Sequence, residues 1–352
     1  MTTATPAGRT PVDLRNPAQL LAALPYLIGF RPAKSAVLIG HEYPGDRPGL
    51  ILRGDLPRRE HRAHQARALS ARFAEGHHAG VTVVIVGGRR RPGKPPPHAG
   101  FLEELTEALS LPVLHALWTP TIRTGAPWGC YRSEECAGTL PDLRATVAAA
   151  AATEHGTVAF DSREELEALL APRSPEALER RADRLSRLTS PPWLDATCVG
   201  DAASVVRAAF ERQRLGEGPL TDEEAVLLAS ALKLPEIRDI CLAMAVPPAS
   251  AEAREAERLW LTLVRETPAP ERAEAATLLG FTAYMRGDGA FAGMALDNAL
   301  EAQPGHVLAE LLKRVLHHGT PPEVIRGLAT AAAGPLAGFG LEPTDLDAER
   351  AA

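Results

Sequence analysis

The segment Gly87-Gly88-Arg89-Arg90-Arg91 directly follows an apolar run, residues 81–86, whose length and composition predict a buried strand. In an open α/β sheet, the loops at the carboxyl ends of the strands line the ligand crevice. Backbone N–H groups and guanidinium groups at that place could bind a phosphate or a carboxylate. The residues that follow are rich in Pro and carry no Gly-x-Gly-x-x-Gly or Walker pattern. An anion site and a solvated loop therefore both stay open, and the loop is favoured.

Asp55 lies just past a second predicted strand, residues 49–53, where catalytic carboxylates often occur. A single Asp before Leu56-Pro57 is as often a turn residue or a helix cap. Serines are few, and none lies in a Gly-x-Ser-x-Gly elbow. The sequence therefore predicts no catalytic residue and no cofactor. The residues expected to line a ligand crevice are Tyr26, Asp55, Gly87, Gly88, Arg89 and Arg90.

Cys130 and Cys136 form a closely spaced pair among four cysteines. Paired zinc ligands usually have two to four residues between them, whereas five separate these two, with no His cluster nearby. We therefore predict two ordinary thiols and no metal site. Four cysteines in 352 residues do not make a disulfide scaffold, so reduced thiols are expected.

His61 and His64 are three residues apart on a predicted helix at residues 58–74, which also carries several arginines. This face could contact a metal or an acidic partner, but a solvated basic face is the simpler interpretation. Nucleic-acid binding through Arg58–Arg72 is disfavoured by the net charge of −6 and by the aromatic content of 5%.

These candidate side chains require an α/β layer to position them. Short apolar runs predict strands at residues 35–40, 49–53, 81–86 and 111–118, and helical patterns occur between several of them. This alternation favours a mixed or partly parallel sheet. Beyond residue 160 helical patterns dominate, with capping-box sequences that begin at Ser162 and Thr221.

The length of 352 residues, of which 45% are hydrophobic, accommodates two domains. We predict an α/β domain at residues 12–172 and an all-α domain at residues 173–335. A disordered arm at residues 1–11 and a flexible tail at residues 336–352 are expected to flank them.

One segment of the helical half follows the register of a single tetratricopeptide-type repeat. Small residues, Gly280 and Ala292, stand where the two helices of such a repeat cross closely, and Pro304 follows the second helix. Ala276 stands where a Trp is usual, and Tyr284 is one place late. A repeat-like hairpin within an irregular bundle is favoured over a generic helix pair.

Several segments together resemble an actinobacterial family, the domain-of-unknown-function family forty-one ninety-two. The first is Pro25-Tyr26-Leu27-Ile28-Gly29-Phe30-Arg31-Pro32; the others include residues 35–38, 55–57, 128–136, 162–164 and 238–239, and Gly287-Asp288-Gly289-Ala290. The resemblance covers about residues 14–328 and implies an intracellular actinobacterial protein without a stated activity. Within the first motif, we expect Pro25, Gly29 and Pro32 to fix a backbone turn against the sheet.

The sequence favours a non-enzymatic protein-interaction or regulatory module over an enzyme or a sensor of an anionic ligand. The N-terminus has no apolar segment typical of a signal peptide, and no run of eighteen apolar residues occurs, so a cytoplasmic protein without membrane contact is expected. The expected partner is a protein, which the sequence does not identify; it assigns no oligomeric state.

Overall fold

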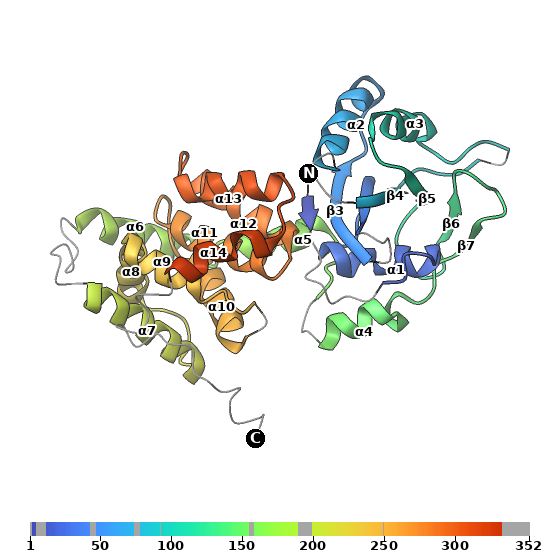
Figure 1. Cartoon of the computed structure of the whole chain (residues 1–352). Helices are drawn as coiled ribbons and strands as arrows, with labels where there is room; N and C mark the ends of the chain where they lie inside the picture. Colours follow the sequence, from blue (N-terminus) through green and yellow to red (C-terminus); the bar gives the residue numbers. More distant parts are fainter. Residues whose placement is uncertain are drawn as a thin grey trace. The chain divides into compact units, whose positions relative to one another are not determined.

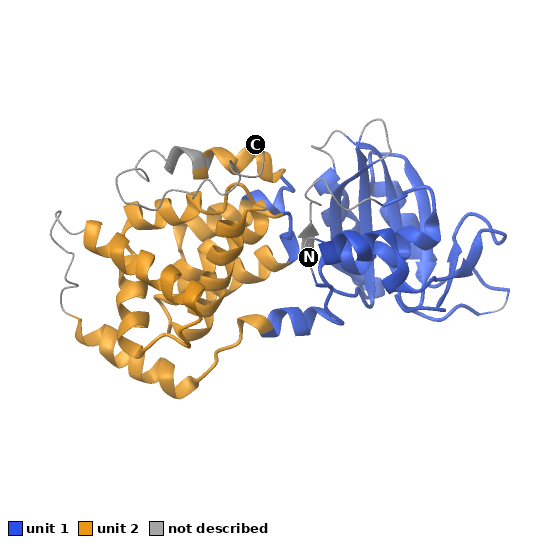
Figure 2. Cartoon of the chain, turned by 90° about the horizontal axis from the view of Figure 1, so that it is seen from below, with its two compact units in different colours: residues 1–168, 287–290, 315–320 blue, residues 169–286, 291–314, 321–352 orange. Residues whose placement is uncertain are grey.

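The computed structural model describes residues 2–4, 12–42, 47–73, 78–91, 93–154, 158–188, 199–248 and 250–332. The chain forms two compact units, which Figure 2 shows in different colours. Unit 1 consists of residues 1–168, 287–290 and 315–320; unit 2 consists of residues 169–286, 291–314 and 321–352. The expected arm at residues 1–11 lies outside the described residues, apart from a strand at Thr2–Ala4. The expected tail at residues 336–352 also lies outside them.

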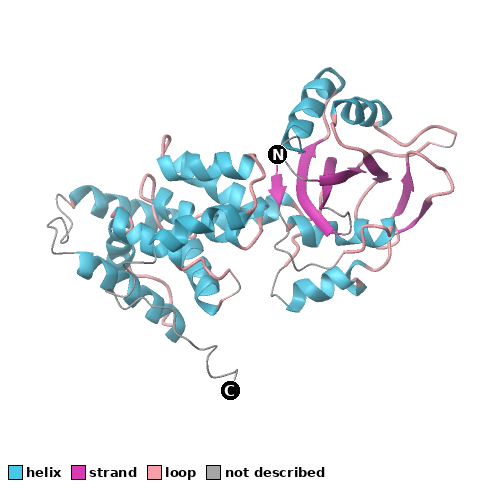
Figure 3. Ribbon diagram, viewed as in Figure 1, coloured by secondary structure: helices cyan, strands magenta, loops and turns pink. Residues whose placement is uncertain are grey.

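Unit 1 contains a mixed sheet of seven strands in the order β1-β3-β2-β4-β5-β6-β7. β4 and β5 are parallel, and the other neighbouring strands are antiparallel. Figure 3 draws the strands in magenta. The prediction of a mixed, partly parallel sheet is confirmed. The strands are β1 (Thr2–Ala4), β2 (Ser35–Glu42), β3 (Arg47–Asp55), β4 (His78–Val86), β5 (Val113–Thr119), β6 (Pro127–Cys130) and β7 (Ala137–Thr139).

Both faces of the central strands are buried, as expected for apolar runs without a polar face. Leu38 and Ile85 belong to the core that the sheet shares with two helices, and the alternating residues Val37 and Val84 are buried on the other face. Figure 1 shows α1 and α4 on the side opposite α2 and α3. The helices of unit 1 are α1 (Pro17–Ile28), α2 (Arg62–Ser70), α3 (Ala99–Ala108), α4 (Val147–Glu154) and α5 (Arg163–Glu167).

Asn16 followed by Pro17 predicts a helix through Leu24, and the sequence from Pro25 onward is too interrupted by Pro and Gly to predict a regular element. Helix α1 begins as predicted but ends later. Asn16 caps it by accepting a hydrogen bond from the N–H of Gln19 at 3.2 Å. The helix continues through Pro25, where the sequence predicts a break, and ends at Ile28. Pro25 removes one donor, but its carbonyl still accepts from the N–H of Gly29 at 2.9 Å. Gly29 then ends the helix in the left-handed conformation, with φ +87°.

Unit 2 is helical throughout its described residues, which confirms the predicted all-α region. Thr221 and Glu224 form the predicted capping box at the start of α8. No helix in the described ranges combines the length and the apolarity needed to span a bilayer. The helices that lie in unit 2 for all or most of their length are α6 (Pro175–Arg187), α7 (Val199–Leu215), α8 (Asp222–Ala231), α9 (Pro235–Ala243), α10 (Ala251–Glu266), α11 (Arg272–Met285), α12 (Gly289–Ala302), α13 (Val307–His317) and α14 (Pro322–Ala332). The first two residues of α12 and the last three of α13 are assigned to unit 1.

Helices α11 and α12 cross closely at Gly280, as their small residues predict. A Cβ atom added to Gly280 would lie 2.8 Å from Cγ of Leu296 and 3.3 Å from the carbonyl oxygen of Ala292. Ala292 is fully buried. The absence of a side chain at Gly280 therefore permits this close approach of the two helices.

Candidate functional site

One edge of the sheet in unit 1 brings several predicted site residues together. Strands β3 and β4 end at this edge and β2 begins there, because Ser35 pairs with both Asp55 and Val86. The N–H of Leu56 donates to the carbonyl of Lys34 at 2.9 Å. A Cβ atom on Gly87 would lie 3.4 Å from Cα of Lys34. Asp55 and Gly87 are thus neighbours of the same residue, Lys34.

The backbone at this edge adopts left-handed conformations. Gly87 and Gly88 have φ +136° and φ +75°. Among the described residues other than Gly, only Lys34 and His98 have positive φ, at +46° and +64°. A Cβ atom on Gly88 would lie 2.6 Å from Cβ of Pro97 and 3.3 Å from Nε2 of His98. Both left-handed residues therefore flank the glycine pair, and such conformations often mark functional positions.

A buried arginine supports the edge from within the sheet. Arg53 is 7% exposed; its Nε donates to Oγ of Ser35 at 2.8 Å, and its Nη2 lies 2.6 Å from Oδ1 of Asp55. The Asp55 carboxylate itself is exposed. The ion pair with Arg53 already accounts for one oxygen of this carboxylate.

The remaining predicted site residues are only loosely associated with this edge. Arg90 pairs with Glu134 at 3.3 Å, and Arg89 is exposed. The Tyr26 hydroxyl donates to the carbonyl of Leu143 at 3.4 Å. Among the residues that the structure describes, no hydrogen bond or ion pair joins Tyr26 to Asp55 or to Arg89.

Lys34 and His98 are the site residues that the sequence did not single out. Burial, and then the nearby charge of Arg62, lower the pKa of His98 below its usual range, so its imidazole is neutral at neutral pH. A neutral imidazole can accept a proton or a hydrogen bond. Lys34 supplies an exposed cation at the same edge. Lysine is rare in this chain, since only four of the 38 lysine and arginine residues are lysines, and this rarity could have drawn attention to Lys34.

The predicted basic helix faces solvent over most of its charged residues. Arg58, Arg59, His61, His64 and Arg67 are exposed on α2 and the turn before it. His77, which the sequence places near this group, lies outside the described residues. Within the part of the chain that the structure describes, no three His, Cys, Asp or Glu residues are arranged to hold a metal ion.

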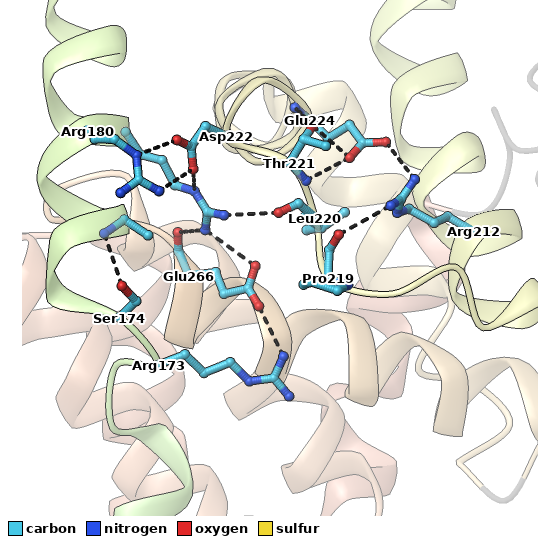
Figure 4. Close-up of polar contacts among 12 residues, drawn as sticks. Arg173, Ser174, Arg180, Arg212, Pro219, Leu220, Thr221, Asp222, Glu224 and Glu266 are labelled. Carbon is cyan, nitrogen blue, oxygen red and sulfur yellow. Dashed lines mark hydrogen bonds and ion pairs between the residues drawn. The ribbon is translucent and has the colours of Figure 1, made fainter.

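A cluster of charged contacts in unit 2 surrounds Arg181, which is 5% exposed. Figure 4 labels its partners Leu220, Asp222 and Glu266. Its Nε donates to Oδ1 of Asp222 at 2.9 Å, and its Nη2 donates to the carbonyl of Leu220 at 3.0 Å. Its Nη1 donates to the Glu266 carbonyl at 2.6 Å and lies 3.3 Å from Oε2 of the same residue. The guanidinium group therefore joins α6 to the start of α8 and the end of α10.

The two acids that bind Arg181 each have a second partner. Glu266, itself 5% exposed, accepts from Arg173 at 3.1 Å, and Asp222 accepts from Arg180 at 2.8 Å. The hydrogen bond from Arg180, with a further one from Arg181, lowers the pKa of Asp222. Each buried charge is neutralised and hydrogen-bonded, so the network satisfies the polar groups where these helices meet and accounts for them structurally.

A family model described as a domain of unknown function, DUF4192, matches residues 17–323. The chain belongs to this family. The resemblance inferred from the sequence is thereby confirmed, and the description of DUF4192 assigns no activity. Comparisons with curated proteins and with solved structures give no match.

Two of the segments that carry the DUF4192 resemblance lie in contact within unit 1. A Cβ atom on Gly29 would lie 3.6 Å from Oδ1 of Asp288, and 3.8 Å from Cδ2 of Leu166. Gly29 ends α1, and Asp288 comes from the later segment 287–290 that belongs to unit 1. The carboxylate of Asp288 thus packs against the backbone of Gly29, where a side chain would stand in any other residue.

Proposed function

We propose that this DUF4192 protein is a non-enzymatic protein-interaction or regulatory module whose binding surface lies on unit 2. The observation that carries this proposal is an exposed apolar pair on α13. Val307 and Leu311 are 71% and 45% exposed. Residues four apart share one face of a helix, so the two side chains form a common surface. A contiguous exposed apolar surface can mark a protein-binding site.

The rest of α13 holds this surface in a fixed orientation within unit 2. Ala309 and Leu312 are buried. Lys313 donates from Nζ to the carbonyl of Gly293 at 3.0 Å and pairs with Asp297 at 2.7 Å, both on α12. A preorganised surface binds with less loss of conformational entropy. The partner that fits it is a protein segment with apolar side chains at its centre.

The polar groups at the sheet edge support a non-enzymatic role less directly. Asp55 is paired with Arg53, and Arg90 is paired with Glu134. No nucleophile with an adjacent base was found in the sequence, and the described contacts of these residues add none. A catalytic role would need a group that is both positioned and free to react.

The experiment is affinity purification of the full chain from its native host, with Val307→Glu/Leu311→Glu compared with the parent. Val147→Glu is the matched control, because Val147 is 62% exposed on α4 of unit 1. We expect a partner that the parent and the control recover equally and that the double variant recovers about tenfold less, equivalent to about 1.4 kcal/mol. Equal recovery by all three proteins, at equal melting temperatures, would contradict the proposal.

A second candidate is an enzyme or a sensor that binds an anionic ligand at the sheet edge. The two left-handed residues beside Gly87-Gly88, Lys34 and His98, favour it. A ligand that binds only the folded state raises its stability in proportion to RT ln(1 + [L]/Kd). A panel of nucleotides and phosphorylated metabolites tests this candidate. A rise in melting temperature that Arg89→Ala/Arg90→Ala/Arg91→Ala abolishes would establish it, whereas the leading proposal expects no rise.

Nucleic-acid binding through α2 is a third candidate. The exposed side chains of Arg58, Arg59 and Arg67 support it. The net charge of −6 disfavours it, because a general attraction to phosphate backbones requires a basic surface.

As part of the same proposal, we place the protein in the cytoplasm of an actinobacterium. Cys130, Cys136 and Cys241 are free thiols, which fits a reducing compartment. The predominance of arginine over lysine fits the codon usage of a GC-rich genome. Fractionation of the native host, followed by detection of the chain, tests this placement.

A further inference from the structure

The hairpin of β6 and β7 places two thiols opposite each other. Its register pairs Gly129 with Ala137. The next pair, toward the loop that joins the two strands, is therefore Cys130 and Cys136. The N–H of Cys130 donates to the carbonyl of Cys136 at 2.8 Å, which continues this register. Directly opposed residues on antiparallel strands have Cα atoms about 4.5–5.5 Å apart and side chains on the same face. A disulfide requires Cα atoms about 4.4–6.8 Å apart.

Both thiols are accessible, and they are close enough to affect each other. Cys130 and Cys136 are half-buried and free, whereas Cys241 is 1% exposed. Burial, and then the proximity of Cys130 and its hydrogen bond, raise the pKa of Cys136. The backbone N–H of Arg132 donates to Sγ of Cys130 at 3.4 Å.

We propose that Cys130 and Cys136 are a redox-sensitive pair that forms a reversible disulfide by exchange with a low-molecular-weight disulfide. The Cys130 thiolate attacks one sulfur of that molecule and releases one thiolate. The Cys136 thiolate then attacks the Cys130 sulfur, breaks the mixed disulfide and releases the second thiolate. The two protein protons pass to the two leaving thiolates. Both cysteine sulfurs are oxidised, and one small disulfide is reduced to two thiols.

The segment that this disulfide would enclose contacts the sheet edge described above. Tyr131 donates from its hydroxyl to the carbonyl of Pro97, and Glu134 pairs with Arg90 at 3.3 Å. Pro97 precedes His98, which flanks Gly88. Closing the disulfide would therefore restrain Tyr131 and Glu134, which contact the loop after β4. Oxidation of the pair could in this way affect the sheet edge at Gly87-Gly88.

Oxidised glutathione is a suitable probe for the reduced full-length protein. After incubation, the remaining thiols are alkylated and the peptides are analysed by mass spectrometry. We expect the parent to lose two hydrogens, to yield a peptide linked between Cys130 and Cys136, and to retain no glutathione at either residue. Cys130→Ser and Cys136→Ser each leave one thiol of the pair, and we expect that thiol to retain glutathione. Cys241 serves as an internal control, alkylated only after unfolding.

Three results would overturn the proposal. The first is that the parent retains glutathione at Cys130 or Cys136 at equilibrium. The second is that both of these thiols can still be alkylated after incubation with excess oxidised glutathione. The third is a disulfide from either residue to Cys198. Release of glutathione from the parent is expected to be independent of protein concentration, since the second step is intramolecular. If a single variant fails to fold, the linked peptide of the parent still decides the question. Faster modification of Cys136→Ser than of Cys130→Ser is expected from the assigned order of attack, and the reverse would overturn that order.

Discussion

The charged residues of the two units are used in different ways. In unit 2, Arg181 and Glu266 are each 5% exposed and bind each other, with Asp222, Arg173 and Arg180 as further partners. At the sheet edge of unit 1, by contrast, Lys34, Asp55 and Arg89 are exposed. Only one of these three, Asp55, has an ion-pair partner among the described residues.

This difference separates charged residues that the fold requires from charged residues that it does not. A buried charge must be neutralised and hydrogen-bonded, so its presence reports on folding. An exposed charge next to a left-handed backbone has no such explanation in packing. We therefore expect substitutions in the Arg181 network to reduce stability, and substitutions at the sheet edge to leave stability almost unchanged.

The largest effect is expected for Arg181→Met. This change leaves Glu266 buried with only the partly exposed Arg173 as an ionic partner. Breaking a buried ion pair from one side typically costs about 3–5 kcal/mol of unfolding free energy. Chemical denaturation followed by circular dichroism measures it. Arg180→Met is the control, with a much smaller loss expected because Arg180 is 58% exposed. Equal losses of unfolding free energy for the two variants would show that burial does not determine how much these contacts contribute to stability.

A loss of intermediate size is expected for Gly280→Leu. Its side chain would collide with Leu296, whose Cγ lies 2.8 Å from the position of a Cβ atom. Overpacking of this kind costs about 1–3 kcal/mol. Gly327 on α14 is the matched control, because nothing lies within 4 Å of its Cβ position. The melting temperature should fall for Gly280→Leu and not for Gly327→Leu, and equal melting temperatures would reject the close crossing.

Stability should also fall in acid because of Asp222. The hydrogen bond from Arg180 holds the pKa of Asp222 below its unfolded value of 3.8, so the contribution is fully present above that pH. It is lost as the pH falls through the lowered folded pKa. Asp222→Asn is expected to be less stable at neutral pH and to show a shallower loss in acid. Parallel pH profiles of unfolding free energy for parent and variant would contradict this role.

The smallest effect is expected at the sheet edge. Arg89→Ala removes an exposed charge, and such changes usually alter the unfolding free energy by less than about 0.5 kcal/mol. Differential scanning calorimetry of parent and variant tests this expectation. A loss comparable to that of Arg181→Met would mean that the edge is as structural as the network in unit 2.

The sequence predicted those features of the fold that depend on local patterns. Apolar runs located β2 to β5, and the capping box at Thr221 located the start of α8. Small residues predicted the close crossing at Gly280. Each of these signals lies within a short stretch of chain, so a single sequence contains it.

The features that were missed depend on contacts between distant residues. β6 and β7 have no apolar alternation, and their pairing with each other and with β5 defines them as strands. Pro25 suggested a break in α1, but the surrounding leucines are buried and the helix continues. The local sequence around Arg181 is that of a charged helix face, and nothing nearby indicates that its side chain is buried. The acids that bind it lie 41 and 85 residues further along the chain.

The candidate site was predicted in part. The topology brings Asp55 and Gly87 to one edge, next to Lys34. No sequence pattern indicated the left-handed conformations of Lys34 and His98, since both depend on how the loops close around the glycine pair. Tyr26 was grouped with these residues, but its hydroxyl binds the carbonyl of Leu143.

The most direct measurement of the central claim is the affinity of the partner recovered from the native host, titrated against parent, Val307→Glu/Leu311→Glu and Arg89→Ala/Arg90→Ala/Arg91→Ala. We expect binding about tenfold weaker or more for the unit 2 double variant, a change of at least about 1.4 kcal/mol, and unchanged binding for the unit 1 triple variant. Unchanged binding by the double variant, with binding lost in the triple variant, would move the function to the sheet edge and contradict the account.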